Sequence, residues 1–520
     1  MMFFATAQVD KLTNRLDADF YNPEYLVLDE KIDKFQTISI GSIAGDPKSV
    51  TYGVLKPRQY ESKFLLARIQ NFEDGFLNLD SCIGIEEEQF TQYARSECVS
   101  GDLIVALGGY PGKACIISKV ESGLRININQ HIARVRVSNS SIDAYYLLGY
   151  FMSNVGRLSL KRQISGSVQA GINLEDLRNL HIVNLMTGAQ KYIGEKVRQA
   201  ERLRAWAKEL QLQIKQQFDF LVKEKPAASK FYRTSIADLE PYRINPGHYD
   251  PVVLSLLKRA SGEGVNLKPI SELLGNRKIA GGATPKGADY LESGVLFGRV
   301  QNVKPLALDL SDAVFIDADT NDQLSRSECQ VDDIVLSITG YPGTASLVTE
   351  QDLPMNINQH SVRFNVNKGV DSAYVCAALN SEFLKLQVQR LSIGGTRDAL
   401  DFPSVGNLLI PRLSEDIESA VAVSVRNYIK AVQLSKLLTF LAKTLVEELI
   451  EGNISEAELV SAQQALEAGD DSLDRALLER MTAEGIDGEG DPLFDDIEQL
   501  YDLLEQAKQA LDADDTMAEA

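Results

Sequence analysis

Side chains suited to reading DNA bases recur at two places in this sequence. Arg68 and Gln70 belong to the segment RIQN, and Arg299 and Gln301 belong to the closely similar segment RVQN. An arginine can donate two hydrogen bonds to a guanine edge, and glutamine or asparagine can pair in the same way with adenine. The chemistry that these residues suggest is recognition rather than catalysis.

A glycine-rich turn accompanies each of these segments. The turn GYPG occurs twice and is expected to expose Tyr110 in one copy and Tyr341 in the other. Lys113 follows the first turn and Thr344 the second. An exposed tyrosine beside a basic or hydroxyl side chain is a common contact to a phosphate or a base.

Two polar loops and a basic cluster complete the candidate site. The loops are KSVTYGVLKPRQY (48–60) and RKIAGGATPKGADY (277–290), and they differ between the copies, as surfaces that read different bases should. The basic cluster is Lys161 and Arg162 in the first copy and Arg390 and Arg397 in the second, and each lies beside a glycine loop. Basic side chains there are suited to hold phosphates. The predicted DNA-contacting residues are Lys48, Tyr52, Lys56, Arg58, Arg68, Gln70, Tyr110, Lys113, Lys161, Arg162, Arg277, Lys278, Thr284, Lys286, Arg299, Gln301, Tyr341, Thr344 and Arg397.

Residues that are identical in the two copies favour a second interpretation. The pentapeptide NINQH occupies Asn127–His131 and returns unchanged at Asn356–His360. Two copies that read different bases should differ where they touch them. NINQH is therefore expected to be mostly scaffold, and RxQN is as consistent with scaffold as with base reading.

Metal chemistry is weakly supported. The chain has four histidines, and no second histidine or carboxylate stands at ligand spacing from the repeated His131 or His360. The five cysteines form no CxxC pair, which argues against a zinc site or a disulfide framework and for a reducing cytoplasm. We expect no bound metal, and we expect the repeat-equivalent Cys98 and Cys329 to be small, buried apolar side chains.

Catalytic motifs are also missing from the sequence. The segment Asn22–Tyr25 (NPEY) lacks the second proline of an adenine-methyltransferase motif, and no P-loop or GxSxG is present. Asp102 and Asp333 occupy equivalent positions before apolar runs, where an aspartate commonly forms a turn. We expect no catalytic residue and no cofactor bound by this chain.

The elements that must position these residues are two copies of one domain. SECVSGDLIVALGGYPGKA, from Ser96, returns as SECQVDDIVLSITGYPGTA, from Ser327, and RLDADFYNPEY, from Arg15, returns as RINPGHYDPVV, from Arg243. The NINQH pentapeptides are 229 residues apart, a period suited to a whole domain. Short β-like runs and one helix-like segment, such as SIDAYYLLGYFMSNVGRLSL in the first copy, predict a mixed domain.

A long helix is predicted after each copy. Within Ala189–Lys225, apolar residues recur in strict seven-residue steps, and Lys225–Pro226 ends the pattern. Glu415–Glu451 carries a second apolar stripe. Each helix would be roughly 55 Å long. The economical arrangement packs them on each other as a rod with a globular copy at each end.

The predicted fold class is α+β: two homologous α/β domains separated by two long antiparallel coiled-coil helices, with a helical acidic extension. The predicted boundaries are 1–186, 187–226, 227–412, 413–452 and 453–520.

The acidic charge is concentrated in the extension. The chain carries a formal net charge of −20, and residues 451–520 hold 21 acidic side chains against three basic ones. The remainder is close to neutral and can still present a basic face. We expect short amphipathic helices in the extension, with Ser455 and Glu458 as a capping box and a last helix at Leu493–Leu511. It could be an arm that docks a partner, a flap that mimics DNA, or a solvated extension.

The sequence predicts no membrane segment. No apolar run approaches eighteen residues, and the start MMFFATAQVDKL does not fit a secretory signal. A cytoplasmic location is expected.

In their order and their repetition, these motifs resemble the specificity (S) subunit of type I restriction–modification systems over nearly all of residues 10–450. YGVLKP and GGATPK are similar to the opening loop of target-recognition domains, and the strands around GYPG and NINQH to their centre. SGSVQAGINLEDLRNLHI and IGGTRDALDFPSVGNLLIP are similar to the closing glycine loop and strand.

The resemblance implies that each domain reads half of a bipartite, asymmetric site in double-stranded DNA and that the helices fix the spacer. It also implies two methyltransferase (M) subunits, which bind S-adenosylmethionine and methylate adenine, and a restriction (R) subunit or another defence effector. The acidic extension departs from the family pattern. An alternative therefore remains: an S-subunit-like protein-interaction scaffold in a related phage-defence complex, whose tail docks a partner or mimics DNA.

Overall fold

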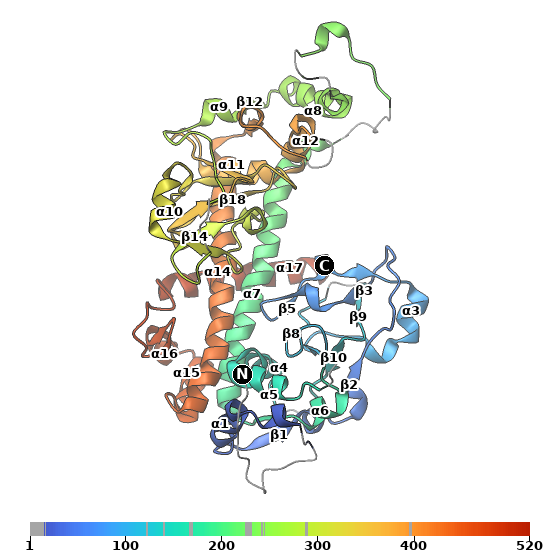
Figure 1. Ribbon diagram of the computed structural model, residues 1–520, viewed down its shortest axis with the longest axis vertical. Coiled ribbons are helices and arrows are strands. Elements are labelled where there is room, and N and C mark those ends of the chain that lie inside the picture. Colours follow the sequence, from blue (N-terminus) through green and yellow to red (C-terminus); the bar gives the residue numbers. More distant parts are fainter. Residues whose placement is uncertain are drawn as a thin grey trace. The chain divides into compact units, whose positions relative to one another are not determined.

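The boundary between two structural units falls inside both long helices. The computed structural model (Figure 1) describes residues 15, 17–120, 123–138, 141–165, 170–223, 231–240, 243, 245–285, 290–394 and 398–519. One unit comprises Met1–Ala205 and Val432–Ala520, and the other comprises Trp206–Ala431. Each unit therefore contains one copy of the repeated domain and a part of each long helix. Among the described residues, no helix is long and apolar enough to cross a membrane.

The first domain is built on a six-stranded sheet beside a three-stranded one. Its strands follow the orders β2-β10-β7-β8-β5-β4 and β6-β3-β9, and β1 pairs separately with β11. These strands are β1 (Thr37–Ser39), β2 (Val50–Tyr52), β3 (Phe64–Ala67), β4 (Phe72–Glu73), β5 (Phe76–Leu77), β6 (Ile83–Gly84), β7 (Leu103–Ala106), β8 (Ala114–Ile116), β9 (Arg125–Ile128), β10 (Ile132–Val135) and β11 (His181–Val183).

The second domain repeats this plan with one strand fewer. Its sheets have the orders β13-β20-β17-β18-β15 and β16-β14-β19, and β12 pairs with β21. These strands are β12 (Asn266–Pro269), β13 (Ala280–Gly281), β14 (Val295–Gly298), β15 (Leu306–Ala307), β16 (Val314–Ile316), β17 (Ile334–Ser337), β18 (Ala345–Leu347), β19 (Met355–Ile357), β20 (Ser361–Phe364) and β21 (Leu409–Arg412). The two domains of the sequence repeat are thus homologous in their strand order.

Central strands have the composition that burial on both faces requires. All four residues of β7 and all four of β17 are buried. Such continuous apolar runs are typical of strands covered on both sides. In register, Arg134 on β10 lies between Thr51 on β2 and Ile104 on β7. Arg363 on β20 lies in the same way between β13 and β17.

Short helices join the strands of each domain. In the first domain they are α1 (Pro23–Ile32), α2 (Ile40–Ala44), α3 (Glu87–Gln92), α4 (Ala144–Met152), α5 (Asn154–Arg162) and α6 (Leu174–Asn179). In the second they are α8 (Pro251–Gly262), α9 (Ile270–Leu273), α10 (Ala318–Gln323), α11 (Ser372–Asn380), α12 (Glu382–Leu391) and α13 (Phe402–Gly406). Within the second domain, α11 lies against β18 (Figure 1).

The helix-like segment of each copy is divided into two helices. Ser153 has an extended backbone, and its hydroxyl accepts a hydrogen bond from the Gly156 amide, which starts α5. Ser381 does the same for α12 through the Leu384 amide. A serine in this conformation caps a new helix rather than continuing the old one. The expectation of one helix in each copy is corrected accordingly.

The two long helices are α7 (Thr187–Asp219) and α14 (Glu415–Glu451). Every residue of the seven-step stripe in the first helical stretch is buried, from Ile193 to Leu221. Leu221 itself lies in a 3-10 turn, Phe220–Val222, that follows α7. In the second unit, Ile214 and Phe218 share a hydrophobic cluster with Val421 and Val425 of α14.

Each unit pairs opposite ends of the two helices. The N-terminal part of α7 belongs with the C-terminal part of α14, and the reverse holds in the other unit. In the first unit, a Cβ built on Gly149 of α4 would lie 3.4 Å from the Ile193 side chain and 3.6 Å from the Ala442 carbonyl oxygen. The helices are therefore antiparallel, and the predicted fold class is confirmed.

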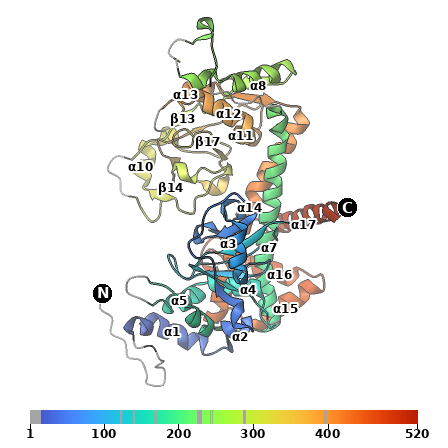
Figure 2. The same cartoon turned by 90° about the vertical axis from the view of Figure 1, so that its right-hand side faces the viewer.

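The acidic extension is a folded part of the first unit. It contains α15 (Glu456–Glu467), α16 (Ser472–Glu479), a hairpin of β22 (Met481–Thr482) and β23 (Gly485–Ile486), and α17 (Ile497–Glu519). The predicted capping box is present, because the Ser455 hydroxyl accepts from the Glu458 amide and the Glu458 carboxylate accepts from the Ser455 amide. α15 and α16 lie against the N-terminal part of α7 (Figure 2).

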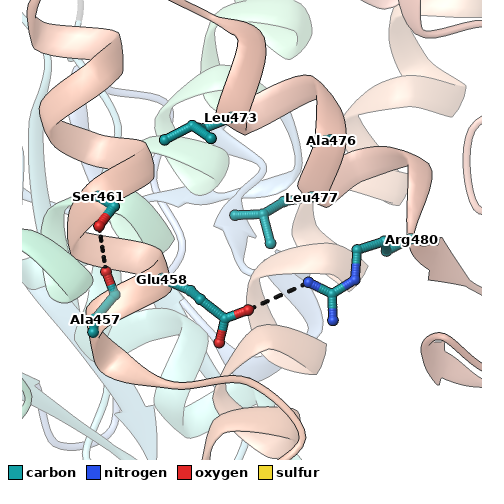
Figure 3. A pocket seen from close by; sticks show the side chains of 7 residues that line it. All are labelled: Ala457, Glu458, Ser461, Leu473, Ala476, Leu477 and Arg480. Carbon is teal, nitrogen blue, oxygen red and sulfur yellow. Dashed lines mark hydrogen bonds and ion pairs between the residues drawn. The ribbon is translucent and has the colours of Figure 1, made fainter.

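A buried ion pair holds the extension in place. Lys196 of α7 donates to Asp474 of α16 at 2.5 Å, and each side chain is only 1% exposed. The hydroxyls of Tyr192 and Tyr501 also donate to Asp474, each at 2.5 Å. The extension is therefore docked rather than solvated. Between α15 and α16 it leaves a groove of about 320 Å³, bordered by the Arg480–Glu458 ion pair (Figure 3).

Candidate nucleic-acid interface

The first asparagine of each NINQH segment holds the scaffold. Asn127 is fully buried, donates to the Tyr93 carbonyl oxygen at 2.9 Å and accepts from the Ser96 hydroxyl at 2.7 Å. Asn356 is buried in the same way and accepts from the Ser327 hydroxyl at 2.8 Å. These amides satisfy loop backbone that would otherwise be buried without partners. Neither is available to a ligand.

The opening loop of each copy passes very close to this strand. Val54 forms a parallel bridge with Asn129. A Cβ on Gly53 would lie 1.7 Å from the Ile128 carbonyl oxygen, and a Cβ on Gly282 would lie 2.1 Å from the Ile357 carbonyl oxygen. Only glycine permits this approach of two backbones. The equivalent glycines therefore place both loops beside the NINQH segments.

The GYPG turn and the RxQN segment of the first copy meet at the same place. Cβ atoms built on Gly108 and Gly109 would lie 3.5 Å from the His131 ring and 3.6 Å from Ile69. Tyr110 is 69% exposed, with the Lys113 ammonium 5.2 Å from its ring centroid. We define the first recognition face as residues 52–60, 68–71, 108–113 and 129–131.

The second copy assembles an equivalent face. The Asn358 amide donates to the Gly298 carbonyl at 3.0 Å, next to Arg299, and the Ile338 amide donates to the His360 carbonyl at 2.9 Å. Tyr341 is 89% exposed. We define the second recognition face as residues 281–285, 299–302, 339–344 and 358–360.

Most of the predicted contact residues within these faces have side chains that solvent reaches. Tyr52, Lys56, Arg58, Gln70, Tyr110, Lys113, Thr284, Gln301 and Tyr341 are exposed, and Arg68, Arg299 and Thr344 are half-buried. In the first loop, Gln89 of α3 accepts from the Arg58 amide and donates to the Lys56 carbonyl oxygen. The loop is thus held at its backbone while its basic side chains stay accessible.

Other predicted residues lie elsewhere. Lys48 and Lys278 are exposed, but they precede β2 and β13, whereas the first recognition face begins at Tyr52, at the opposite end of β2. Lys161 is exposed at the end of α5, where Leu160 approaches Gly112. Lys286 and Arg397 lie outside the described residues.

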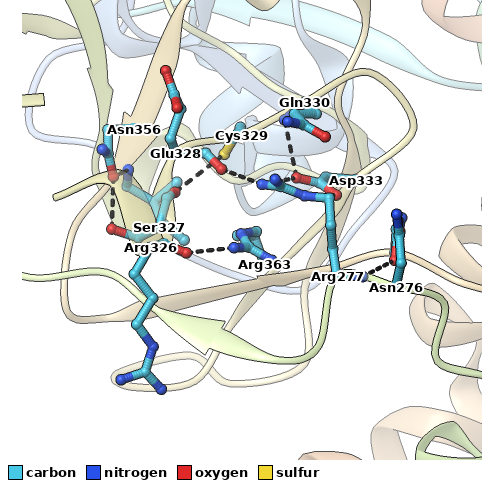
Figure 4. Close-up of polar contacts among 12 residues, drawn as sticks. Asn276, Arg277, Arg326, Ser327, Glu328, Cys329, Gln330, Asp333, Asn356 and Arg363 are labelled. Carbon is cyan, nitrogen blue, oxygen red and sulfur yellow. Dashed lines mark hydrogen bonds and ion pairs between the residues drawn. The ribbon is translucent and has the colours of Figure 1, made fainter. Parts of the chain in front are cut away.

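Two predicted arginines are engaged within their domains. Arg162 donates to the Asp29 carboxylate at 2.7 Å and to the Phe20 carbonyl at 2.9 Å. Arg277 donates to the Asp333 carboxylate at 3.1–3.2 Å and to the Glu328 carbonyl oxygen (Figure 4). Both guanidinium groups are therefore engaged in hydrogen bonds within the fold.

The two copies pair an equivalent buried aspartate with arginines that come from different positions. Asp333 is buried, and so is its equivalent Asp102 in the first copy. Asp102 is paired instead with Arg136, at 2.6–2.7 Å. Position 365, the counterpart of Arg136, is an asparagine that accepts from the Arg277 amide. The two aspartates, expected only to form turns, each also bind an arginine that comes from a different strand end.

The electrostatics around these pairs reflect burial. Desolvation lowers the pKa of Arg134 and of Arg363, and the neighbouring Arg136 or Arg277 lowers it further. Arg134 donates to the Glu97 carbonyl at 2.6 Å and to the Lys48 carbonyl at 3.0 Å. These buried arginines tie loops to the central sheet.

Sequence reasoning missed one pair of accessible arginines. Arg95 and Arg326 are exposed and immediately precede the repeated SEC segments. The Arg95 guanidinium lies 5.4 Å from the ring centroid of Tyr52, so it borders the first recognition face. In Figure 4 the Arg326 side chain points away from the Arg277–Asp333 pair. The sequence signal that could have identified them is their equivalent position in the two copies.

Among the described residues, no three histidine, cysteine or acidic side chains are grouped closely enough to hold a metal ion. Each recognition face is thus a set of hydrogen-bond donors, aromatic rings and positive charges on a rigid sheet. That arrangement can contact phosphates and base edges.

No family model matches the chain. The chain is 26% identical over 206 residues to the type I restriction enzyme EcoBI specificity subunit of Escherichia coli, and the aligned part is 39% of this chain and 41% of that protein. That similarity agrees with the motifs and the repeated domain described above. Over this part of its length, the chain is similar in sequence to a type I restriction specificity subunit.

The match spans about two fifths of the length of this curated specificity subunit. Among solved structures, the S subunit from M. genitalium is 14% identical, with a TM-score of 0.36, and the similarity covers 82% of this chain and 96% of that one. The HsdS subunit from Thermoanaerobacter tengcongensis is 13% identical, with a TM-score of 0.26, over 81% and 97% of the two chains.

Proposed function

We propose that this chain is the DNA sequence-recognition subunit of a type I restriction–modification complex. Each recognition face would read one half of a bipartite, asymmetric site in double-stranded DNA. The observation that carries this proposal is the construction of the same face twice, on the same strand order, with different side chains exposed on it. An identical scaffold with divergent contact residues is what a reader of two unlike half-sites requires.

The chemistry of the faces supports major-groove reading. In the first face, Arg68 and Gln70 can donate to guanine and adenine edges, and Lys113 can hold a phosphate. Tyr110 and Tyr341 project from rigid glycine turns, where their rings and hydroxyls are available to DNA. The catalytic steps would belong to the partners, and this chain would supply no catalytic residue.

The partners in this proposal are two methyltransferase subunits and a restriction subunit. The methyltransferases would bind S-adenosylmethionine and methylate adenine in the recognised site. The antiparallel helices α7 and α14 would fix the number of unread base pairs between the half-sites and would offer the methyltransferases a docking surface. This one chain would then determine both the bases that are read and the distance between the two half-sites.

Domain exchange tests the proposal directly. Residues 235–412 are replaced by the second recognition domain of another specificity subunit, and adenine methylation is mapped across the genome of a host that expresses the complex. We expect only one half of the methylated motif to change. The matched control replaces residues 1–186 and should change only the other half. Alteration of both halves by one exchange, or methylation without any sequence motif, would contradict the proposal.

A further inference from the structure

The two RxQN segments differ in how their side chains are held. In the second face, one aspartate contacts all three polar side chains of the segment. Gln301 donates to the Asp312 carboxylate at 2.7 Å and Asn302 does so at 2.5 Å. Arg299 donates to the Asp312 carbonyl oxygen at 2.5 Å, and its guanidinium lies 3.6 Å from the carboxylate.

The first face has a serine at the equivalent position. The Asn78 amide donates to the Asn71 carbonyl, as the Asp309 amide does to the Asn302 carbonyl, each at 2.9 Å. Three residues beyond these amides are Ser81 and Asp312. Asn71 donates to the Ser81 carbonyl and hydroxyl oxygens at 2.6 and 2.8 Å, just as Asn302 donates to the Asp312 side chain.

Ser81 therefore anchors the asparagine without engaging its neighbours. In the described part of the chain, Arg68 and Gln70 make no side-chain hydrogen bond or ion pair with a carboxylate, and Gln70 is exposed. The arginine Nε is buried without a hydrogen-bond partner in both copies, so the difference lies at the Nη groups and at the glutamine amide.

We propose that Asp312 withdraws Arg299 and Gln301 from DNA reading, so that Arg68 and Gln70 contact bases in the first half-site while the second half-site is read without their counterparts. This inference rests on the proposed function and assigns a specificity-determining role to Asp312 and Ser81. A carboxylate that is 60% exposed offers a permanent acceptor to Arg299 and Gln301. Its charge also opposes the approach of phosphates and of the guanine acceptors O6 and N7.

Reciprocal substitutions test this assignment. Ser81→Asp and Asp312→Ser each introduce the residue of the other copy, so each keeps an acceptor for Asn71 or Asn302. The affinity of the full-length chain in complex with its methyltransferase subunits is measured across salt concentrations. The probes are a duplex that carries the methylated motif of the host genome and a scrambled duplex.

The arginines are tested in both backgrounds. Arg68→Ala should weaken binding to the motif duplex about 10-fold, the size expected for losing one bidentate base contact, whereas Arg299→Ala should change it less than about 2-fold. Ser81→Asp should reproduce the loss. Asp312→Ser should tighten binding and steepen the dependence on salt by about one phosphate contact. In the Asp312→Ser background, Arg299→Ala should remove that gain.

The outcomes separate this inference from the function beneath it. A wild-type complex that binds the motif and scrambled duplexes equally would refute the proposed function. If the wild type discriminates but Arg299→Ala costs as much as Arg68→Ala, or Ser81→Asp leaves affinity and salt dependence unchanged, only the role of Asp312 is overturned. Thermal unfolding checks that each variant is folded, and Asp312→Asn replaces Asp312→Ser if that variant is not.

Discussion

The buried pair between Lys196 and Asp474 makes the docking of the acidic extension testable. Asp474→Ala would leave the Lys196 ammonium, which is 1% exposed, without its counter-charge. It would also leave the hydroxyls of Tyr192 and Tyr501 without their acceptor. Breaking a buried ion pair by removing one partner costs about 3–5 kcal/mol. That corresponds to roughly two to four powers of ten in the equilibrium between docked and undocked extension.

Hydrogen–deuterium exchange of the full-length chain measures this equilibrium. In Asp474→Ala, amides of α15, α16 and α17 should exchange faster, while the central strands of the first domain keep their protection. The control is Glu467→Ala, which breaks the ion pair between Glu467 and Lys191. Both of these side chains are about half exposed, so the exchange rates should change little. Equal protection in Asp474→Ala and wild type would refute the reasoning. Replacing the pair by Lys196→Met with Asp474→Leu should recover much of the loss.

The same pair predicts a dependence on pH. Burial alone would raise the pKa of Asp474, but Lys196 and the hydrogen bonds from Tyr192 and Tyr501 together outweigh it, so the pKa lies below its ordinary value. The docked state is therefore stabilised above the unfolded pKa of about 3.9, and this stabilisation is lost as the pH falls through the lower folded value. Protection of the extension should fall below about pH 4 in the wild type. Asp474→Asn should lack that component.

Three further predictions concern the domains. Gly53→Ala should destabilise the first domain by about 2–3 kcal/mol in denaturant unfolding, because its Cβ would overlap a carbonyl oxygen, whereas Gly262→Ala, with open space around it, should be nearly neutral. Arg136→Ala should cost about 1.5 kcal/mol, since it removes charged hydrogen bonds to the buried Asp102 while leaving the Val99 amide as a partner; unfolding midpoints equal to wild type would contradict this. Burial raises the pKa of the Cys82 thiol to about 12, so it should react slowly with a disulfide reagent at pH 8 until the chain is denatured; rapid native reaction would show the thiol to be accessible.

The sequence predicted the architecture well because repetition reports equivalent positions without revealing contacts. The seven-residue stripe from Ile193 to Leu221 is buried throughout, since a heptad pattern specifies one face of a helix. The second long helix has the predicted bounds, Glu415–Glu451. The first ends at Asp219, and a 3-10 turn follows it, so the helix is shorter than the predicted end at Lys225. A proline sets the last position that a helix can reach, but the helix can end before it.

Pairing across distant strands could not be predicted in the same way. Arg277 stands in a divergent loop and therefore resembled a ligand contact, but its partner Asp333 is 56 residues away. Lys196 is one of several polar residues among the apolar steps of the first long helix, and its partner Asp474 comes 278 residues later. Nothing in local periodicity distinguishes a cation in water from one that meets a carboxylate brought by the fold.

The arginine exchange between the copies bears on which pieces of the chain can be moved. Asp102 and Asp333 are both buried and both need a guanidinium, but Arg136 follows the NINQH strand whereas Arg277 begins the opening loop. Replacing the loop 277–290 by the loop 48–60 would remove Arg277 while leaving an asparagine at position 365, so Asp333 would stay buried without a counter-charge. The domain would lose stability for a reason unrelated to DNA, and a changed specificity could not be interpreted. A whole domain carries its own aspartate and arginine together, which makes it the appropriate unit of exchange for assigning half-sites.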